Sequence, residues 1–238
     1  MQEVASDVPV VFVTYDLLED AGEDIRARPL RDRRARLEQV LDALPMESRE
    51  RLRLSEALVA ATWGELGSVR QCSRERGVEG VMLKRWTSPY HTGRRRGDWW
   101  KWKIEPHTID AVLIYAQPGS GRRASLFTDY TFGVWDGDEL VPVAKAYSGL
   151  TDTEIDELDR WVRRHTTGRF GPVSAVEPIH VFELGFERIA RSSRHRSGVA
   201  VRFPRMLRWR RDKSAREADT LETLRALLAI QDDSVPRR

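Results

Sequence analysis

From residue 109 onward the chain is a series of short β-rich segments separated by glycine and proline. One helical segment, residues 152–166, comes late in the order and opens with a Thr-x-x-Glu capping box at Thr151 and Glu154. The strands are expected at residues 111–116, 124–135, 140–147, 179–189 and 199–203. Five short strands with one late helix favour a small closed barrel, for which the OB-fold is the obvious candidate.

Residues 1–104 have a different pattern, in which helices and strands are mixed. An apolar, β-branched run at residues 10–15 predicts a buried strand, and residues 32–44 and 62–76 have helical features. Residues 80–85 and 99–104 predict two further strands. We therefore expect an α+β chain with two domains, residues 1–104 and residues 105–238.

Several classes of protein are excluded by composition. No apolar run approaches the roughly 20 residues that span a bilayer, and no basic segment precedes the first apolar run, as a signal peptide requires. The lone Cys72 rules out an intramolecular disulfide framework and a Cys-cluster zinc site. The five histidines lack metal-ligand spacing, so we expect them on the surface or in loops. The chain is expected to be soluble and cytoplasmic.

The hexamer Glu79-Gly-Val-Met-Leu-Lys84 places a carboxylate at a glycine-containing turn, five residues before a lysine. Such a glutamate could hold a divalent metal ion beside a phosphate. A charged strand edge explains the same hexamer about as well. The hexamer therefore leaves both interpretations open.

A second basic motif follows in residues 94–103. The chain has 40 basic residues, of which five are lysines, so lysines beside a motif stand out. Lys101 and Lys103 share one face of the expected strand, since side chains repeat every second residue. With Arg94, Arg95 and Arg96 just before them, they favour a phosphate site over a solvated basic edge.

The third motif is the segment RFPRMLRWRRDK, residues 202–213. Basic residues interleaved with Phe203 and Trp209 are typical of nucleic-acid binding, although a basic surface strand is the alternative. Within it, Asp212 can orient Arg210 or Lys213 toward a nucleotide phosphate. Tyr15, at the end of the first apolar run, could stack on a base, but an aromatic there is more often core.

Taken together, these segments resemble the later motifs of the ATP-dependent DNA ligases, which belong to the covalent nucleotidyltransferase superfamily. VFVTYDLLE with RPLRDRRARLE, GVEGVMLKR, DWWKWK and VRFPRMLRWRRDK occur in the family's order. The resemblance covers nearly the whole chain and is closest in character to bacterial core-type ligases. It implies the C-terminal part of an adenylation (nucleotidyltransferase) domain in residues 1–104, followed by an OB-fold domain in residues 105–238.

One family motif is absent, because none of the five lysines begins the K-x-D-G sequence of the ligase nucleophile. The resemblance therefore implies a chain without the N-terminal half of the adenylation domain: a truncation, a gene fragment or a protein completed by a separate chain. We expect the chain alone to form no acid-stable AMP adduct.

The resemblance implies that an intact relative seals nicks in duplex DNA with ATP and Mg²⁺, through a ligase-AMP and a DNA-adenylate intermediate. Such a ligase would act in DNA repair, replication and recombination. It would be a monomer, and other repair proteins could be its partners. Tyr15 would stack on adenine, and Lys101 and Lys103 would hold the α-phosphate. Glu79 would hold Mg²⁺, and Arg95 would lie near the nucleotide.

Motif matching also assigns residues to the leaving group and to DNA. Arg210, Asp212 and Lys213 would orient the pyrophosphate leaving group. The DNA itself would contact Arg94, Arg96, Arg202 and Arg205, with Phe203 in the minor groove or simply packed. An RNA ligase, an mRNA-capping-type enzyme and a non-catalytic OB-fold DNA-binding module are the alternatives; the RFPR…RxDK ending favours a DNA ligase.

Overall fold

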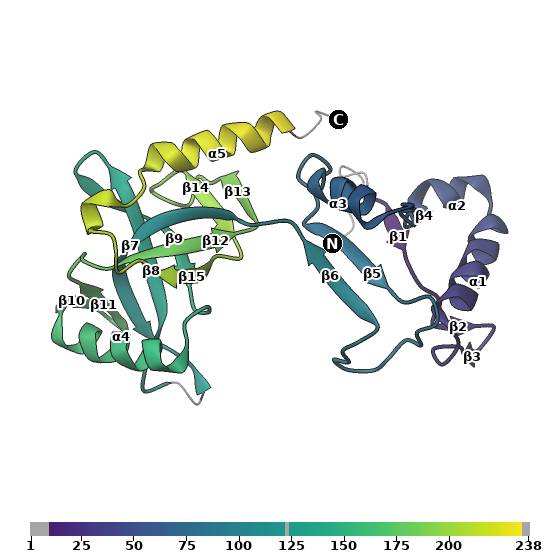
Figure 1. Ribbon diagram of the computed structural model, residues 1–238, viewed down its shortest axis with the longest axis horizontal. Helices are drawn as coiled ribbons and strands as arrows, with labels where there is room; N and C mark the ends of the chain where they lie inside the picture. The colour runs from purple at the N-terminus through teal and green to yellow at the C-terminus, as the bar shows by residue number, and fades with distance from the viewer. Residues whose placement is uncertain (1–9, 122–123, 235–238) are drawn as a thin grey trace, which may run out of the picture. The chain divides into compact units, whose positions relative to one another are not determined.

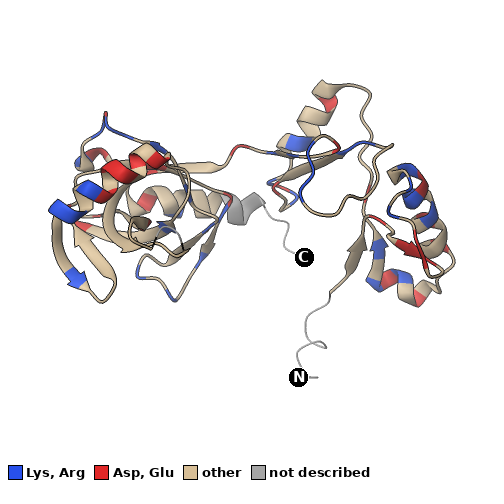
Figure 2. Cartoon of the chain, turned by 90° about the horizontal axis from the view of Figure 1, so that it is seen from below, with Lys and Arg blue, Asp and Glu red and all other residues tan. Residues whose placement is uncertain are grey.

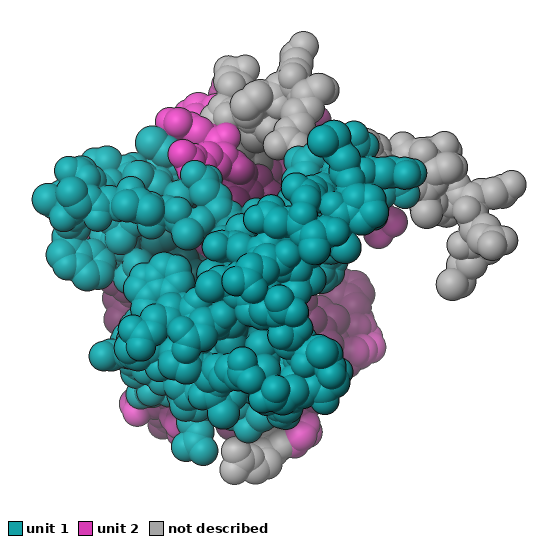
Figure 3. All heavy atoms as spheres, turned by 90° about the vertical axis from the view of Figure 1, so that its right-hand side faces the viewer, with its two compact units in different colours: residues 1–73, 80–104 teal, residues 74–79, 105–238 magenta. Residues whose placement is uncertain are grey.

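The computed structural model describes residues 10–121 and 124–234 (Figure 1). The chain forms two compact units, Met1–Ser73 with Gly80–Ile104, and Arg74–Glu79 with Glu105–Arg238 (Figure 3). We call them the first and the second unit. Acidic and basic residues are interspersed over both units and do not gather in one block (Figure 2). Any anion-binding character must therefore come from local groups of side chains.

The first unit combines helices with small sheets. In helix α1 (Leu30–Asp42) the buried side chains recur every three to four residues, which is the periodicity that a helix packed on one face requires. Thr62 accepts a hydrogen bond from the Glu65 amide and so caps α3 (Trp63–Gln71). The strand pairs are β1 (Phe12–Thr14) with β4 (Leu52–Leu54), β2 (Glu19–Asp20) with β3 (Glu23–Asp24), and β5 (Gly80–Lys84) with β6 (Trp99–Lys103), and α2 spans Met46–Arg51.

The apolar run at residues 10–15 does form a strand, β1, but the expectation that it is buried was wrong. Phe12 is 68% exposed and Val13 is 51% exposed. Among the described residues, β1 pairs only with β4, in parallel register, and its apolar side chains remain exposed. A β-branched run therefore predicts the strand correctly, whereas its burial depends on what packs over it.

The second unit is built around the long strand β7 (His107–Pro118). Along one edge β7 pairs with β8 (Phe127–Asp136), which pairs in turn with β9 (Glu139–Ala146). Along the other edge it pairs with β12 (Val181–Phe186) and β11 (Val173–Val176). The sheet ends on β10 (Thr166–Phe170) beside β11 and on β15 (Arg205–Trp209) beside β12. The result is a curled sheet with a packed interior, in which Tyr130, Phe132, Phe182 and Leu184 are buried.

Helix α4 (Asp152–Arg164) begins where the sequence predicted. The Thr151 side chain accepts a hydrogen bond from the Glu154 amide, and the Glu154 carboxylate accepts one from the Thr151 amide. Residues 179–189, expected as one strand, form two: β12 stays in the sheet, whereas β13 (Arg188–Arg191) pairs with β14 (Val199–Arg202). A short 3₁₀ helix, Ala215–Glu217, precedes the last helix, α5 (Leu221–Ser234). None of the helices in the described part of the chain is long and apolar enough to cross a membrane.

Candidate functional site

The hairpin of β5 and β6 presents the two lysines that the sequence singled out. In its antiparallel register Met82 lies opposite Lys101, and Gly80 lies opposite Lys103. Because side chains alternate along a strand, Lys101 and Lys103 project from the same face, and both are exposed. Arg94, Arg95 and Arg96 are exposed in the loop that joins the two strands. The hairpin therefore carries two ammonium groups on one face, close in sequence to three guanidinium groups.

Gly80 explains why the hexamer contains a glycine. Its φ is +142°, and a Cβ there would lie 2.4 Å from the carbonyl oxygen of Trp102 and 2.6 Å from the Cα of Lys103. Only a residue without a side chain permits this close approach of two backbones. Glu79 directly precedes Gly80 and is partly buried. This close contact therefore fixes the backbone directly after Glu79.

Glu79 is the sequence's candidate for a metal ligand. In residues 10–121 and 124–234 no group of three or more His, Cys, Asp or Glu side chains is placed to hold a metal ion. One carboxylate nevertheless fits Mg²⁺, which often takes one or two protein carboxylates and completes its shell with phosphate and water. Glu79 alone is therefore suited to a metal ion that is already bound to a phosphate, and less suited to one held by protein side chains only.

A cavity of about 1170 Å³ lies in the first unit. The residues that line it include Tyr15, Arg34, Lys84 and Trp99, but neither Lys101 nor Lys103. The Lys84 ammonium lies 4.2 Å from the ring centre of Tyr15 and 4.2 Å from that of Trp99. Burial lowers the pKa of Lys84. The cavity is large enough for a nucleotide, and Lys84 is a lining residue to which sequence reasoning gave no role.

A buried ion pair holds Tyr15 beside this cavity. The Nε and Nη2 atoms of Arg33 each donate to a carboxylate oxygen of Asp16 at 2.8 Å, and the side chains are 0% and 2% exposed respectively. Arg33 Nη1 donates to the Ser88 carbonyl at 3.1 Å, and the Ser88 hydroxyl accepts from the Trp99 indole at 3.0 Å. The residue after Tyr15 is therefore tied to α1 and, through Ser88, to β6.

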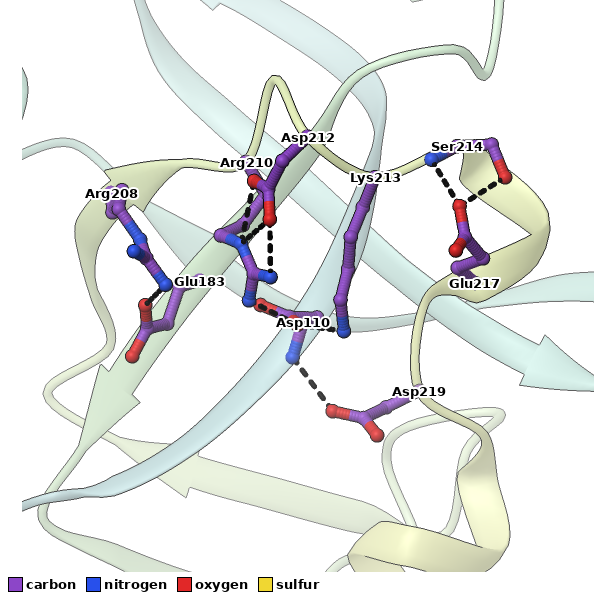
Figure 4. Close-up of polar contacts among 9 residues, drawn as sticks. All are labelled: Asp110, Glu183, Arg208, Arg210, Asp212, Lys213, Ser214, Glu217 and Asp219. Carbon is purple, nitrogen blue, oxygen red and sulfur yellow. Dashed lines mark hydrogen bonds and ion pairs between the residues drawn. The ribbon is translucent and has the colours of Figure 1, made fainter.

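In the second unit, the spaced motif residues meet in one polar group, drawn in Figure 4. Arg210 donates through Nε and Nη2 to Asp212, which raises the pKa of Arg210 and lowers that of Asp212. Arg210 Nη1 and Lys213 Nζ both donate to Oδ2 of Asp110, at 2.8 and 2.6 Å. We call Asp110, Arg210, Asp212 and Lys213 the motif cluster. The structure brings together the three residues that the sequence grouped and adds a fourth.

Asp110 escaped the sequence analysis, although a signal was present. It is a carboxylate within an otherwise apolar run on β7, and a charge in such a run requires a partner. Its amide donates to a carboxylate oxygen of Asp219 at 2.7 Å, and its carbonyl accepts from the Asp219 amide at 2.8 Å. These contacts fix the backbone of Asp110 within the motif cluster.

The tip between β14 and β15 carries the remaining candidates. Phe203 has a φ of +53° and is 59% exposed, with the Arg202 guanidinium 4.8 Å from its ring centre. Arg205 donates to the buried carboxylate of Glu187 at 2.9 Å. Arg202 and Phe203 are thus presented to solvent, whereas Arg205 also has a structural contact.

His180 lies outside the predicted site, in the loop before β12, and is partly buried there. Its ring is partly buried between Trp161 and Trp209, with ring centres 4.3 and 4.8 Å away. Burial, with a contribution from nearby Arg211, lowers the pKa of His180 to about 4. The neutral imidazole is therefore the form that packs in the folded state.

This pKa predicts a loss of stability in mild acid. Unfolded His180 takes up a proton near pH 6.5, whereas the folded form does so only near pH 4. As pH falls through this window, the second unit should lose on the order of 1–2 kcal/mol of unfolding free energy, after allowance for partial solvent screening. Urea unfolding followed by tryptophan fluorescence at pH 7.5 and pH 4.5 measures the loss. His180→Phe should reduce it; an equal loss in that variant would assign it to other groups.

Two family models match the chain. The first, described as ATP dependent DNA ligase domain, covers residues 1–103, and the second, ATP dependent DNA ligase C terminal region, covers residues 123–213. A probable DNA ligase of Koribacter versatilis is 39% identical over an alignment of 250 positions, gaps included, that spans 98% of this chain and 43% of that protein. A DNA ligase of Thermococcus onnurineus is 35% identical over 234 residues, covering 98% and 41%. The chain thus spans less than half the length of these relatives.

Among solved structures, that of a Lig E DNA ligase matches with a TM-score of 0.57 and 16% identity, covering 84% of this chain and 63% of that one. At this identity the likeness shows the fold alone. It confirms the expected α+β class, with an OB-like curled sheet in the second unit.

Proposed function

This chain belongs to the ATP-dependent DNA ligases, and we propose on this premise that it serves the sealing of nicks in duplex DNA through enzyme-AMP and DNA-adenylate intermediates. Residues 1–104 would contribute the C-terminal part of an adenylation domain, and residues 105–238 the OB domain. The observation that carries the proposal is the β5–β6 hairpin, whose two same-face lysines belong to the same unit as a nucleotide-sized cavity.

The proposed chemistry is phosphoryl transfer, in which negative charge must be stabilised on non-bridging oxygens. Lys101 and Lys103 would bind the α-phosphate, and Arg95 would lie near the nucleotide. Tyr15, which lines the cavity, would stack on adenine. The nucleophile is assigned to no lysine of this chain, because none begins a K-x-D-G sequence.

Glu79 would hold Mg²⁺, which neutralises phosphate charge when bound. In the second unit, Arg210, Asp212 and Lys213 would orient the pyrophosphate leaving group. Arg94, Arg96, Arg202 and Arg205 would contact DNA phosphates, and Phe203 would enter the minor groove. A monomer bound to nicked duplex DNA, in the cytoplasm, is the assembly we propose.

DNA binding tests this assignment directly. We expect the chain to bind a nicked duplex weakly and with a steep salt dependence, because each neutralised phosphate releases counterions. Arg202→Ala should weaken binding on all sequences alike and reduce the log–log salt slope by about 0.9 for a lost phosphate contact. Fluorescence anisotropy at several salt concentrations gives the slopes.

Arg160→Ala, on an exposed part of α4, removes the same charge from the same unit and should leave the slope unchanged. Arg205→Ala should also reduce stability, by about 1–3 kcal/mol, because it leaves the buried Glu187 carboxylate without this partner. Affinity that ignored salt, or that changed equally in Arg202→Ala and Arg160→Ala, would exclude the proposed role of the tip.

A non-catalytic OB-fold DNA-binding module is the second candidate, favoured by the fact that the second unit has its own buried core. Such a module would pass the DNA test. ATP binding by the β5–β6 hairpin separates the two functions, because only the ligase assignment requires it.

A further inference from the structure

The motif cluster has no net charge. Arg210 and Lys213 supply two positive charges, and Asp110 and Asp212 supply two negative ones, all within ion-pair distance (Figure 4). An anion that approaches the two cations therefore meets groups that are already neutralised. For Arg210 and Lys213 to bind a polyphosphate, at least one of these internal ion pairs must give way.

Asp110 is the carboxylate that the two cations share. Its Oδ2 accepts from both Arg210 and Lys213, whereas Asp212 pairs with Arg210 from an exposed position. Asp110 is 8% exposed, and its backbone is held by two hydrogen bonds with Asp219. If the Arg210 side chain turns toward solvent, the exposed Asp212 can stay paired with it, whereas the buried Asp110 cannot. The contacts with Asp110 are therefore the ones that an incoming anion has to replace.

The second carboxylate oxygen of Asp110 is buried and has no hydrogen-bond partner among the described residues. A buried acceptor left without a partner costs free energy. The carboxylate is thus not kept in this apolar strand because all of its hydrogen bonds are satisfied. What it does provide is a negative charge in contact with Arg210 and Lys213.

We propose that Asp110 is a positioning residue that takes the place of a polyphosphate whenever none is bound to the second unit. It holds the Arg210 guanidinium and the Lys213 ammonium side by side and neutralises them until a pyrophosphate group replaces its Oδ2. The inference rests on the proposed function of Arg210 and Lys213. It deepens that function by making the site selective: displacing an internal carboxylate favours a highly charged pyrophosphate over orthophosphate.

Isothermal titration of the full chain with inorganic pyrophosphate and with orthophosphate, at constant ionic strength, tests the proposal. Asp110→Asn should bind pyrophosphate about tenfold more tightly than the parent, since one negative charge is removed at contact distance from the anion. The same variant should discriminate less between the two anions. Asp110→Glu, which keeps the charge, should retain the parent's affinity and selectivity.

Asp129→Asn is the matched control, because Asp129 also pairs with a lysine of the second unit, Lys145, at 3.2 Å. Equal tightening in both Asn variants would mean a general effect of net charge and would overturn the proposal. Circular dichroism checks the fold first; if Asp110→Asn does not fold, Asp110→Ser replaces it in the same comparison.

Arg210→Gln separates this inference from the function on which it rests. If Arg210→Gln loses pyrophosphate binding but removing the Asp110 charge weakens binding or leaves it unchanged, the inference is wrong and the proposed function stands. If Arg210→Gln binds pyrophosphate like the parent, or no form of the chain binds it, both are wrong. Tighter binding confined to the uncharged Asp110 variants supports both.

Discussion

Arg33→Met should lower the free energy of unfolding of the first unit by about 3–5 kcal/mol, because it leaves the Asp16 carboxylate buried without its partner. The loss is large for a unit in which β1 is exposed and the sheets are small. The second unit has a separate core and should keep its unfolding midpoint. Urea unfolding, with limited proteolysis and mass spectrometry to assign the cleaved residues to each unit, measures the two separately.

Two further variants make this prediction specific. Arg26→Met removes an arginine whose ion pair with Asp24 is exposed, and it should leave the midpoint nearly unchanged. Asp16→Leu combined with Arg33→Met should recover much of the lost stability, since an apolar pair can replace a buried ion pair at little cost. A first unit as stable in Arg33→Met as in the parent would mean that the ion pair does not hold Tyr15 and α1 together.

Replacing both hairpin lysines should weaken ATP binding by the chain more than replacing either one. Each of Lys101→Met and Lys103→Met should weaken it about tenfold, since each removes a charge-assisted contact to phosphate. We expect the two losses to be coupled in a double-mutant cycle if both lysines contact the same phosphate group. Quenching of tryptophan fluorescence during titration with ATP and Mg²⁺ reports the affinity, because Trp99 and Trp100 line the cavity.

Lys145→Met is the control, since Lys145 lies on β9 in the second unit. It changes the net charge by the same amount and should leave ATP binding intact. Parent-like ATP affinity in the double hairpin variant would show that the lysines do not hold the phosphate. The non-catalytic module would then be the better description of the chain.

What the sequence predicted well is local. Alternation along a strand placed Lys101 and Lys103 on one face, and a capping box fixed the start of α4 at Thr151, because both patterns are decided within a few residues. Arg210, Asp212 and Lys213 lie within four residues, so one turn brings them together. Such features depend little on the rest of the fold.

What the sequence missed depends on contacts between distant segments. Asp110 lies 100 residues before Arg210, and only the pairing of β7, β12 and β15 makes them neighbours. Arg33 looked like one arginine among many in its segment, yet the position of Asp16 makes it the buried one. Periodicity assigns a residue to a face, but it does not name the partner on the neighbouring strand or helix.

At Phe203 the backbone conformation opposes thermal stability to the proposed role of the ring in DNA binding. A phenylalanine held at a φ of +53° is less stable there than glycine would be, by roughly 1 kcal/mol. A lineage under selection for thermal stability alone would drift toward glycine or asparagine at the tip, because both tolerate this conformation. If the ring has its proposed place in the minor groove, selection for DNA binding acts in the opposite direction, and the strained residue persists as the cost of that function.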